Sequence, residues 1–403
     1  MDYRDTLNLP QTNFNMKANL AQKEPLLLKR WEKEDLYGKL QEKGQQKPLY
    51  ILHDGPPYAN GHIHLGTAFN KILKDIILKS RRMAGFQAPY VPGWDCHGLP
   101  IEHNVDQELG AKKKEIPKLS KRGACRKYAE KWVKTQKAEF KRLGVLGDWD
   151  QPYLTMNYDY EAVIAREFNR FLLSGAVIRN KKPVFWCSTC TTALAEAEVE
   201  YYDHTSPSIY VKFPVADDLS DIDPALAAAK VSVVIWTTTP WTLPANLAVA
   251  FHPDFVYAAV RVEDELLILA QELVAKVMAE MGITAYAVTA TFSARQLEHR
   301  NCRHPLLERQ SLMVLANYVT AEAGTGRGHT APGHGADDYL TGLRYGLEIL
   351  SPVDSEGYYT AEAGPYQGQQ VPAVNKVINA DMQAAGVLQH ERANNHSYPG
   401  GWP

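Results

Sequence analysis

The chain has 403 residues, with 44 Lys or Arg against 46 Asp or Glu, so its formal net charge is −2. Hydrophobic residues make up 45% and charged residues 22%, which excludes a collagen, a disordered tail and a disulfide-stapled miniprotein. No apolar run approaches the roughly 20 residues of a membrane-spanning helix, and the N-terminus has no secretory h-region, so we expect no membrane partner. Five cysteines, an odd number, favour reduced thiols and a cytoplasmic location.

The pattern of elements divides the chain into four segments. Residues 1–45 are polar and predicted to be helical, and residues 46–196 show the strand, loop, helix, strand order of a βαβ unit. Short apolar runs between turns predict an inserted, mostly β domain over residues 197–390, followed by a return segment, 391–403. The predicted fold class is α/β, a partial parallel sheet with a mostly β insertion.

Two loops of the second segment fall where a ligand would bind. Apolar runs over residues 48–53 and 88–92 suit buried parallel strands, and the apolar spacing after residue 64 marks one face of a long helix. A Gly- and Pro-rich turn, residues 54–61, follows the first run, and residues 93–98 follow the second. Ligands sit at the carboxyl ends of strands in open parallel sheets, so both loops are candidate site loops.

A basic stretch follows these loops. Residues 111–143 carry 13 Lys or Arg against three Glu. Apolar residues recur there at helical spacing, and Gly144 follows as the expected C′ residue. The stretch is therefore predicted to be a helix with a solvated basic face; the alternative is a surface that faces nucleic-acid phosphates.

The mostly β domain is predicted from five short runs. Each is rich in β-branched or aromatic residues, which fit a pleated surface, and turns separate the runs. The predicted strands are 208–213, 231–236, 256–262, 266–270 and 311–315.

The first loop places a pair of histidines, His62 and His64, at the start of a helix. Unpaired backbone N–H groups and the helix dipole favour an anion there, and histidine can donate to phosphate oxygens. The plainer interpretation is two ordinary surface or core histidines. On spacing alone, both interpretations stay open.

Four motifs carry a family resemblance. Asp54-Gly55-Pro56-Pro57-Tyr58-Ala59-Asn60-Gly61, leading into His64-Leu65-Gly66, resembles the HIGH signature of class I aminoacyl-tRNA synthetases, in the wording of the isoleucine enzymes. Gly93-Trp94-Asp95-Cys96-His97-Gly98-Leu99-Pro100-Ile101-Glu102 resembles their amino-acid-binding loop. Residues 236–246 and 329–339 resemble the two halves of the editing site in the inserted domain called connective peptide 1. The resemblance is to the N-terminal part of these enzymes and implies the HIGH half of a Rossmann-like sheet with an editing insertion.

The resemblance implies a synthetic site that activates isoleucine with ATP and Mg²⁺ and charges tRNA(Ile). Histidine there would stabilise charge that develops at the α-phosphate. A carboxylate would hold the α-ammonium group of isoleucine by a charge-assisted hydrogen bond. The implied catalytic residues are His64, Gly66 and Thr67, of which His64 and Gly66 bind ATP, and the implied isoleucine-binding residues are Gly55, Pro56 and Asp95. The alternative for Asp95 is a turn or cap residue.

The resemblance also implies an editing site. One methylene in an apolar pocket gives only about 1–3 kcal/mol of discrimination, a limit for which the isoleucine enzymes are themselves the standard worked case. A second site would therefore hydrolyse valyl-tRNA(Ile). Its implied residues are Asp338 as the ammonium clamp, Thr237, Thr238, Thr239 and Thr242 as hydroxyl groups and walls, and Asn246, His329 and His334 to orient the terminal adenosine or the water. The threonine run could instead continue a strand, which Pro240 would interrupt.

The sequence departs from the family pattern in three places. Thr67 stands where the HIGH signature has its second histidine, and no Lys-Met-Ser-Lys loop occurs before Pro403. We therefore expect the lone chain to retain editing only, and we expect a second chain to carry the KMSKS half and the anticodon domain. Arg327 and Gly328, just before His329, replace the small apolar residues expected there, and the charged Arg327 would weaken the pocket or meet tRNA phosphates.

Two cysteines have metal-ligand spacing. Cys187 and Cys190 have the two-residue spacing of half a zinc site. The run that ends the chain, Gly400-Gly401-Trp402-Pro403, supplies no further cysteine, so we do not expect a four-ligand site from this chain alone.

Two other functions stay open. One is a non-catalytic tRNA-binding or assembly half of a split or decayed synthetase. The other takes Thr67 as the mark of an adenylate-forming enzyme of another kind. Hydrolysis of valyl-tRNA separates the editing prediction from the first of these.

Overall fold

The computed structural model describes residues 3–8, 13, 17–227, 229–321 and 324–400. The chain folds into two compact units, residues 1–178 and 179–403. The last three residues of the predicted return segment lie outside the described residues, and the division into four segments remains a prediction. In the described part of the chain, no helix combines the length and the apolar character needed to cross a membrane.

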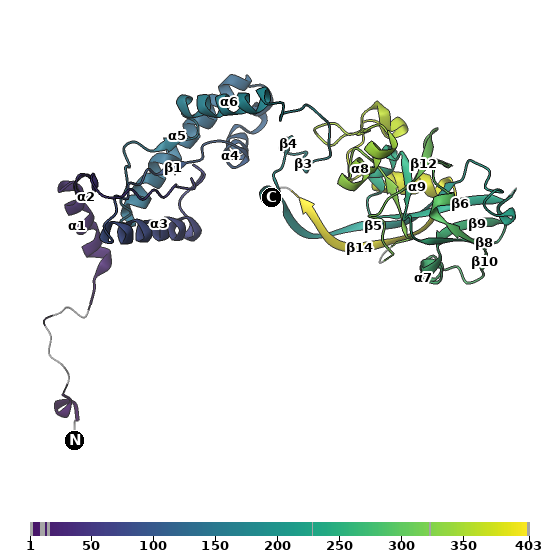
Figure 1. The fold of residues 1–403 in the computed structure, drawn as a ribbon, viewed down its shortest axis with the longest axis horizontal. Coiled ribbons are helices and arrows are strands. Elements are labelled where there is room, and N and C mark those ends of the chain that lie inside the picture. Colours follow the sequence, from purple (N-terminus) through teal and green to yellow (C-terminus); the bar gives the residue numbers. More distant parts are fainter. Residues whose placement is uncertain (1–2, 9–12, 14–16, 228, 322–323, 401–403) are drawn as a thin grey trace. The chain divides into compact units, whose positions relative to one another are not determined.

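The first unit is mainly helical (Figure 1). Its core is aromatic, because Tyr90, Trp94 and Phe140 are fully buried and the ring of Trp149 stacks on Phe140 at 6.2 Å. Tyr37 ties α2 to this core, since its hydroxyl accepts from the backbone N–H of Tyr90 at 2.9 Å. The helices are α1 (Leu20–Lys33), α2 (Leu36–Gly44), α3 (Leu65–Met83), α4 (Leu99–Leu109), α5 (Lys118–Arg142) and α6 (Tyr158–Leu173).

Helix α3 is buried on an unexpected face. The apolar residues that predict this helix are largely solvent-exposed, with Phe69 61% and Ile76 56% exposed. The buried residues of the helix are Lys71, Asp75 and Leu78. The predicted helix is confirmed, but the face that packs on the unit carries a lysine and an aspartate.

Helix α5 confirms the helix predicted from the basic stretch. It ends at Arg142, and Gly144 follows in the left-handed region with φ 80°, as expected of a C′ residue. Basic side chains of this helix form ion pairs with acidic residues from other elements of the unit, which lowers the local excess of positive charge. The pairs are Lys121–Asp106, Arg126–Glu161, Lys137–Asp150, Lys141–Glu32 and Arg142–Glu24.

The parallel pairing of the first unit is short. Strand β1 (Gly93–Trp94) pairs in parallel with β2 (Tyr153–Leu154), and Leu49 forms a single parallel bridge with Gln87. The predicted strands over 48–53 and 88–92 are therefore wrong as regular strands. A parallel strand needs partners along its length, and in the described residues the first run bonds only around Gln87. The α/β fold class itself is confirmed.

The second unit is mostly β, and all five predicted strands are present. A six-stranded sheet has the order β10-β8-β9-β6-β5-β14, and a four-stranded sheet has the order β11-β12-β7-β13. Strand β6 pairs in parallel with β9, and β7 with β12. The strands are β3 (Trp186–Cys187), β4 (Thr192–Ala193), β5 (Glu200–Pro214), β6 (Lys230–Thr237), β7 (Ala248–Phe251), β8 (Val256–Val262), β9 (Glu265–Ala270), β10 (Ala287–Ser293), β11 (Asn301–Arg303), β12 (Gln310–Leu315), β13 (Arg327–Thr330) and β14 (Leu388–Gly400).

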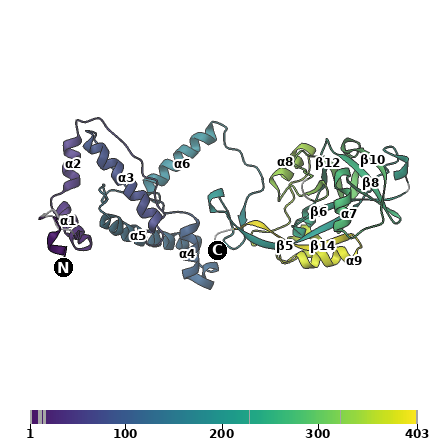
Figure 2. The same cartoon turned by 90° about the horizontal axis from the view of Figure 1, so that it is seen from below.

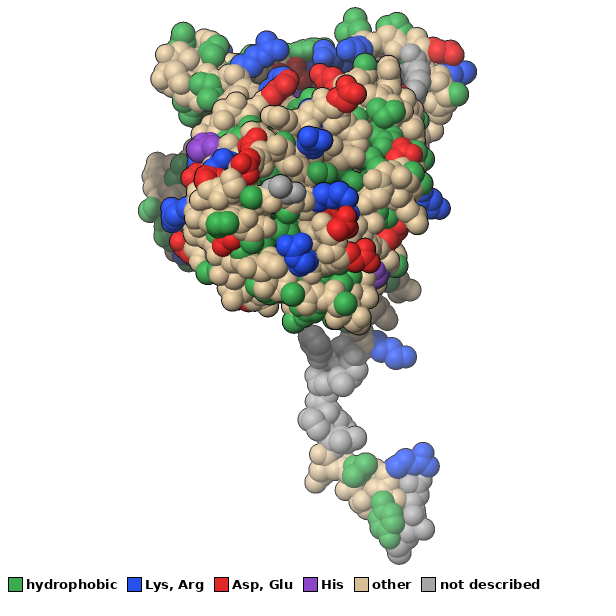
Figure 3. All heavy atoms as spheres, turned by 90° about the vertical axis from the view of Figure 1, so that its right-hand side faces the viewer, with side chains coloured by type: hydrophobic (Ala, Val, Ile, Leu, Met, Phe, Trp, Pro, Cys, Tyr) green, Lys and Arg blue, Asp and Glu red, His purple; other side chains and the backbone are tan. Residues whose placement is uncertain are grey.

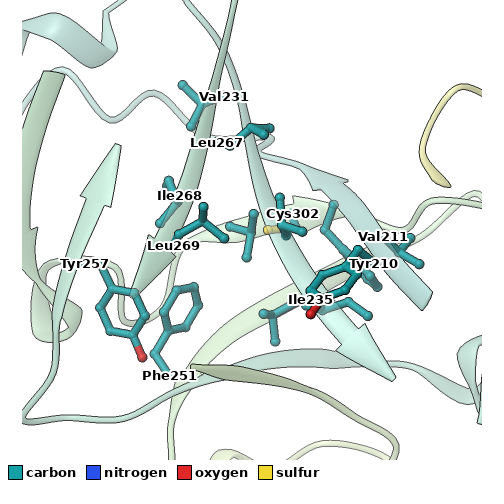
Figure 4. Close-up of a cluster of buried hydrophobic side chains, with 14 of the residues drawn as sticks. Tyr210, Val211, Val231, Ile235, Phe251, Tyr257, Leu267, Ile268, Leu269 and Cys302 are labelled. Carbon is teal, nitrogen blue, oxygen red and sulfur yellow. The ribbon is translucent and has the colours of Figure 1, made fainter. Parts of the chain in front are cut away.

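One large apolar core joins the sheets of the second unit (Figure 4). Strand β6 is buried on both faces along most of its length, as expected of a central strand with a continuous apolar run. The rings of Phe251 and Tyr257 meet edge to face, with centroids 5.1 Å apart. This core fixes the ends of β6 and β7, and β13 pairs antiparallel with β7.

Helices and a long ribbon complete the second unit. Strands β5 and β14 pair antiparallel over their length and form the extended ribbon in Figure 1. Helix α9 (Asn375–Ala384) contacts β14, and both are drawn in yellow in Figure 2. The other helices are α7 (Val274–Glu280) and α8 (Ala336–Tyr345). On the face seen in Figure 3, acidic and basic side chains are intermixed rather than gathered by sign.

Candidate functional site

The first candidate site begins at the N-terminus of α3. The backbone N–H of Gly66 donates to His64 Nδ1 at 3.0 Å, and the N–H of His64 donates to Thr67 Oγ1 at 2.9 Å, so the two side chains form a reciprocal capping box. Because Nδ1 accepts, the neutral imidazole carries its proton on Nε2. His64 is exposed, and its Nε2–H is a donor at a helix N-terminus.

Gly66 makes this arrangement possible. A Cβ at this position would lie 2.9 Å from Cε1 of His64, so any side chain would push the imidazole out of its place. Thr67 fills the third helical position as a cap, which gives the departure from the HIGH pattern a structural role. His64, Gly66 and Thr67 are thus brought together.

The two loops of the first site pair with each other. The N–H of Asp95 donates to Pro57 O at 2.9 Å, and the N–H of Ala59 donates to Asp95 O at 2.8 Å. The carboxylate of Asp95 accepts from the N–H of His97 at 3.2 Å and from Thr155 Oγ1 at 3.3 Å. The structure therefore places Asp95 beside the loop of Gly55 and Pro56, and it also gives Asp95 the turn role of the alternative interpretation.

A buried ion pair lies beneath these loops. Asp54, directly before Gly55, is 1% exposed and pairs with Lys71 of α3, while Lys74 Nζ lies 2.7 Å from its other oxygen. The N–H of Gly93, the first residue of the second loop, donates to Asp54 at 2.9 Å. One carboxylate thus anchors both site loops.

The pKa values of both residues of this pair are lower than their ordinary values. Burial alone raises the pKa of Asp54, but the positive charge and hydrogen bond of Lys71 outweigh it and hold that pKa below its ordinary value. Burial lowers the pKa of Lys71 to about 8, only partly offset by Asp54. Removing either residue would leave the other charge buried and uncompensated, so the two stabilise the fold only as a pair.

The second candidate site lies at the end of β6. This strand ends at Thr237, and a 3-10 turn, Pro240–Ala245, begins at Pro240, so the predicted interruption of the strand is confirmed. Thr239 Oγ1 lies 3.3 Å from Thr242 Oγ1, which in turn lies 3.0 Å from His329 Nε2. A hydrogen-bonded chain therefore joins the threonine run to the histidine motif of β13. Thr237 Oγ1 extends it at 3.3 Å from Thr239 Oγ1, and Thr238 lies in the bend between β6 and the 3-10 turn.

Two histidines of this site carry unsatisfied polar atoms. Within the described residues, His329 Nδ1 and His334 Nε2 are buried without a hydrogen-bond partner. Burial, with a smaller contribution from nearby His329, lowers the pKa of His334 to about 4. Burial also lowers the pKa of His329, against the raising effect of Asp338. Both imidazoles are neutral at pH 7, and their free nitrogens need a polar ligand or a water molecule.

Asp338 lies in the first turn of α8. One of its oxygens accepts from the Tyr318 hydroxyl at 2.8 Å, and the other accepts from the N–H of Ala331 at 2.9 Å. Ala331 follows β13 directly, so the carboxylate is tied to the strand that carries His329. The structure brings Asp338, His329, His334 and the threonine run to one place.

The side chain of Asn246 bonds to the four-stranded sheet. It is fully buried, its amide N–H donates to Ala248 O at 2.8 Å, and its amide oxygen accepts from Ser311 Oγ at 2.6 Å. In the structure it fixes the 3-10 turn to the four-stranded sheet. Its role toward adenosine or water stays a prediction.

The two cysteines of the predicted half zinc site lie on one turn. Cys187 ends β3, and the N–H of Cys190 lies 3.3 Å from Cys187 Sγ. Among the described residues, no group of three or more His, Cys, Asp or Glu side chains is placed to hold a metal ion. The turn offers two of the four ligands that a structural zinc site uses.

Comparison with known proteins identifies the family. The model of tRNA synthetases class I (I, L, M and V) matches residues 26–323, which is more than half of the chain. The chain belongs to the class I tRNA synthetase family. It is 72% identical to the isoleucine–tRNA ligase of Desulfotalea psychrophila over 403 residues, and 56% identical to that of Syntrophotalea carbinolica over 402 residues. Each alignment covers 100% of this chain and 43% of the relative, so the chain spans less than half of their length.

A solved structure gives a weaker likeness. The crystal structure of GlLeuRS-CP1 aligns with 46% of this chain and 98% of its own, with a TM-score of 0.39 and 17% identity.

Several residues around the two sites of this synthetase family member are not indicated by any motif in the sequence. Lys71 and Lys74 are spaced like surface lysines, and their pairing with Asp54 depends on how α3 packs. Tyr318 lies in no recognised motif. A signal that could have found the pair is the buried spacing of Lys71, Asp75 and Leu78, which share one face of a helix.

Arg327 lies in the core and not at the surface. It is 5% exposed, and its guanidinium lies over the rings of Phe251 and Tyr257 at 5.5 and 5.3 Å. Within the described residues, its three side-chain nitrogens have no hydrogen-bond partner, and burial lowers its pKa to about 9. The expectation that it meets tRNA phosphates is wrong, because a phosphate contact needs an accessible side chain.

Proposed function

We propose that the chain contributes the N-terminal part of an isoleucine–tRNA ligase. Its substrates would be isoleucine, ATP and tRNA(Ile), with Mg²⁺ accompanying ATP. The proposal is supported by relatives of that name that match all of this chain. For the lone chain it is confined to hydrolysis of valyl-tRNA(Ile), which the hydrogen-bonded cluster of Thr239, Thr242 and His329 in the second unit supports.

The observation that carries this proposal is the contact between Thr242 and His329. It joins residues of two motifs that are 87 positions apart in the chain, and Asp338 and His334 lie near His329. The site so formed offers one fixed negative charge for an α-ammonium group and neutral groups for an ester and a water molecule. A neutral aminoacyl ester with a cationic amine fits this set.

The histidines would orient water and not remove its proton. A general base works best when its pKa lies near the operating pH, whereas burial holds the pKa of His334 at about 4. Neutral imidazole nitrogens can still donate to and accept from a water molecule. The two unpaired atoms, His329 Nδ1 and His334 Nε2, are the positions at which such a water would be held.

The threonines would exclude isoleucine. Thr237, Thr239 and Thr242 are linked by hydrogen bonds, so their β-branched side chains form a stiff wall. A rigid wall rejects a larger side chain better than a yielding one, because overpacking costs typically about 1–3 kcal/mol. Valine would enter and isoleucine would not.

The first unit would hold the synthetic half-site. His64 would donate from Nε2–H to the triphosphate, and Asp95 would meet the α-ammonium group of isoleucine beside Gly55 and Pro56. A second chain or segment with a KMSKS loop and an anticodon domain would supply the remaining groups. Zinc at Cys187 and Cys190 would need two further ligands.

The test is the deacylation rate of valyl-tRNA(Ile) by the purified chain, with isoleucyl-tRNA(Ile) as the control. We expect loss of valine at least about tenfold faster than loss of isoleucine. Equal rates, or no hydrolysis of either, would overturn the editing proposal. In that case the non-catalytic tRNA-binding function would be favoured, and a filter-binding assay with tRNA(Ile) would measure it.

A further inference from the structure

We infer that Tyr318 is a positioning residue for the α-ammonium group of the editing substrate and acts through Asp338. This inference rests on the proposed editing function. It assigns a role to a residue outside the four recognised motifs.

The first argument is the geometry of the carboxylate. Asp338 lies in the first turn of a surface helix, where a free side chain would sample several rotamers. Two donors from other segments fix it: the N–H of Ala331 on one oxygen and the Tyr318 hydroxyl on the other. With one donor on each oxygen, the plane of the carboxylate is set, and lone pairs remain for a cation.

The direction of the tyrosine hydrogen bond is also fixed. A carboxylate has no proton, so the O–H of Tyr318 donates to Asp338. Thr330 Oγ1 lies 3.3 Å from the same hydroxyl and, since the tyrosine proton is committed, Thr330 donates to it. The chain of donors from Thr330 through Tyr318 to Asp338 ties the carboxylate to the residue that follows His329. The ammonium clamp and the histidine therefore keep a constant separation.

The tyrosine remains a donor across the working pH range. Burial raises the pKa of Tyr318 above its ordinary value, and the negative charge of Asp338 raises it further. The phenol is therefore protonated wherever the enzyme works.

Glycine at position 335 also leaves space for the carboxylate of Asp338. A Cβ at Gly335 would lie 2.9 Å from Asp338 Oδ2, so a side chain there would displace the carboxylate. Glycine at position 335 thus leaves the room in which Tyr318 and Ala331 hold the carboxylate. A residue that served packing alone would not need a hydroxyl aimed at this carboxylate.

The experiment measures recognition of the ammonium group without catalysis. The probes are a non-hydrolysable amide of valine with 3′-amino-3′-deoxyadenosine and its analogue without the α-amine. Their Kd values are measured by calorimetry at pH 6.5, where the amine is protonated. The proteins are the whole chain, Tyr318→Phe and Tyr345→Phe. The last is a matched control, because the Tyr345 hydroxyl also donates to a carboxylate, Glu298, at 2.6 Å.

We expect the unmodified chain to prefer the amine-bearing probe. Tyr318→Phe should reduce that preference about tenfold, the loss expected when a hydrogen bond to a charged group is removed. Tyr345→Phe should keep the full preference. In an Asp338→Asn background, Tyr318→Phe should change the preference little, because the two residues act as one unit.

Three results would overturn the inference, and they are distinguishable. If Tyr318→Phe keeps the full preference for the amine, the inference fails while the editing proposal stands. If it weakens both probes equally, the tyrosine has a structural role only. If the unmodified chain binds neither probe, the proposed function fails and this inference fails with it.

Discussion

The two candidate sites use opposite physical means. Residues 1–178 carry 29 Lys or Arg against 21 Asp or Glu, whereas residues 179–403 carry 15 against 25. The first site is an exposed helix N-terminus above a buried ion pair, and the second is a buried set of hydroxyls and neutral imidazoles around one carboxylate. A positive unit with a helix N-terminus suits a triphosphate, and a neutral pocket with one negative charge suits an aminoacyl ester.

The two sites also differ in the interactions that hold their loops. Asp54 fixes its loops with charges that no solvent screens, so losing one partner leaves the other uncompensated. The second site depends on hydrogen bonds between neutral groups, each worth less. The stability of the first unit should therefore be more sensitive to loss of a charge. The stability of the second unit should be more sensitive to pH, because it buries neutral histidines.

The largest expected effect is on the first unit. Asp54→Asn removes the charge that compensates buried Lys71, and we expect the unit to lose about 3–5 kcal/mol of unfolding free energy. Urea unfolding followed by hydrogen exchange of α3 peptides measures it. Asp150→Asn is the control in the same unit, because Asp150 is 92% exposed and solvent screens its pair with Lys137 of α5, so its loss should change the stability little. Equal losses in both variants would refute the anchoring role of Asp54.

The next effect is on hydrolysis in the second unit. Asp338→Asn removes the negative charge. Its amide oxygen can still accept from the N–H of Ala331, and its amide N–H can donate to the Tyr318 hydroxyl. We expect the rate of valyl-tRNA(Ile) hydrolysis to fall about 100-fold, because a buried charge-assisted contact with the substrate is lost. We expect little change in the free energy of unfolding. Asp337→Asn, its exposed neighbour on α8, should react at the normal rate. Comparable loss in both variants would remove the clamp assignment.

A pH effect should distinguish the units. The pKa of His304 is lowered to about 3 and that of His334 to about 4, both by burial, so their stabilising contribution is complete above the ordinary value of 6.5. It is lost as the pH falls from 6.5 toward 4, by about 2 kcal/mol per histidine at pH 5. In the first unit, Lys71 titrates near 8 and Asp54 below its ordinary value, both outside this window. Hydrogen exchange should show weaker protection of β6 and β9 at pH 5 than at pH 7, with unchanged protection of α3. An equal change in α3 would contradict this difference between the units.

A smaller effect tests the buried cation of the second unit. Arg327→Leu replaces an unpaired guanidinium with an apolar side chain, and we expect a gain of about 1–3 kcal/mol, because burying an unpaired charge is costly. Thermal unfolding measures it, with Arg295→Leu as the reference, since that arginine is 65% exposed. A lower melting temperature for Arg327→Leu would mean that its contacts with Phe251 and Tyr257 outweigh the cost of burial.

The smallest effect concerns the helix cap of the first site. Thr67→Ala removes half of the capping box with His64, and we expect a loss of about 1 kcal/mol. Thr135→Ala makes the same change within α5, where it should cost little because alanine favours a helix. Urea unfolding of both variants measures the difference, and equal stability would show that the box contributes nothing.

Local patterns were sufficient for much of the fold. The strands near residues 208, 231, 256, 266 and 311 follow from β-branched runs between turns, and the end of β6 follows from Pro240. The end of α5 follows from Gly144, whose φ of 80° suits glycine. These features depend on short stretches of chain, so the sequence specifies them directly. The runs over 48–53 and 88–92 failed as strands because pairing depends on distant partners.

The sequence by itself determined the family, and it predicted two candidate sites and the residues that would serve them. Only the tertiary structure decided which face of α3 is buried, that Lys71 lies against Asp54, and that Asn246 and Arg327 lie in the core. It also brought Tyr318 to Asp338. The physical reason is that a charge or a hydroxyl has its effect through the groups around it, and in these cases those groups come from segments far away in the chain.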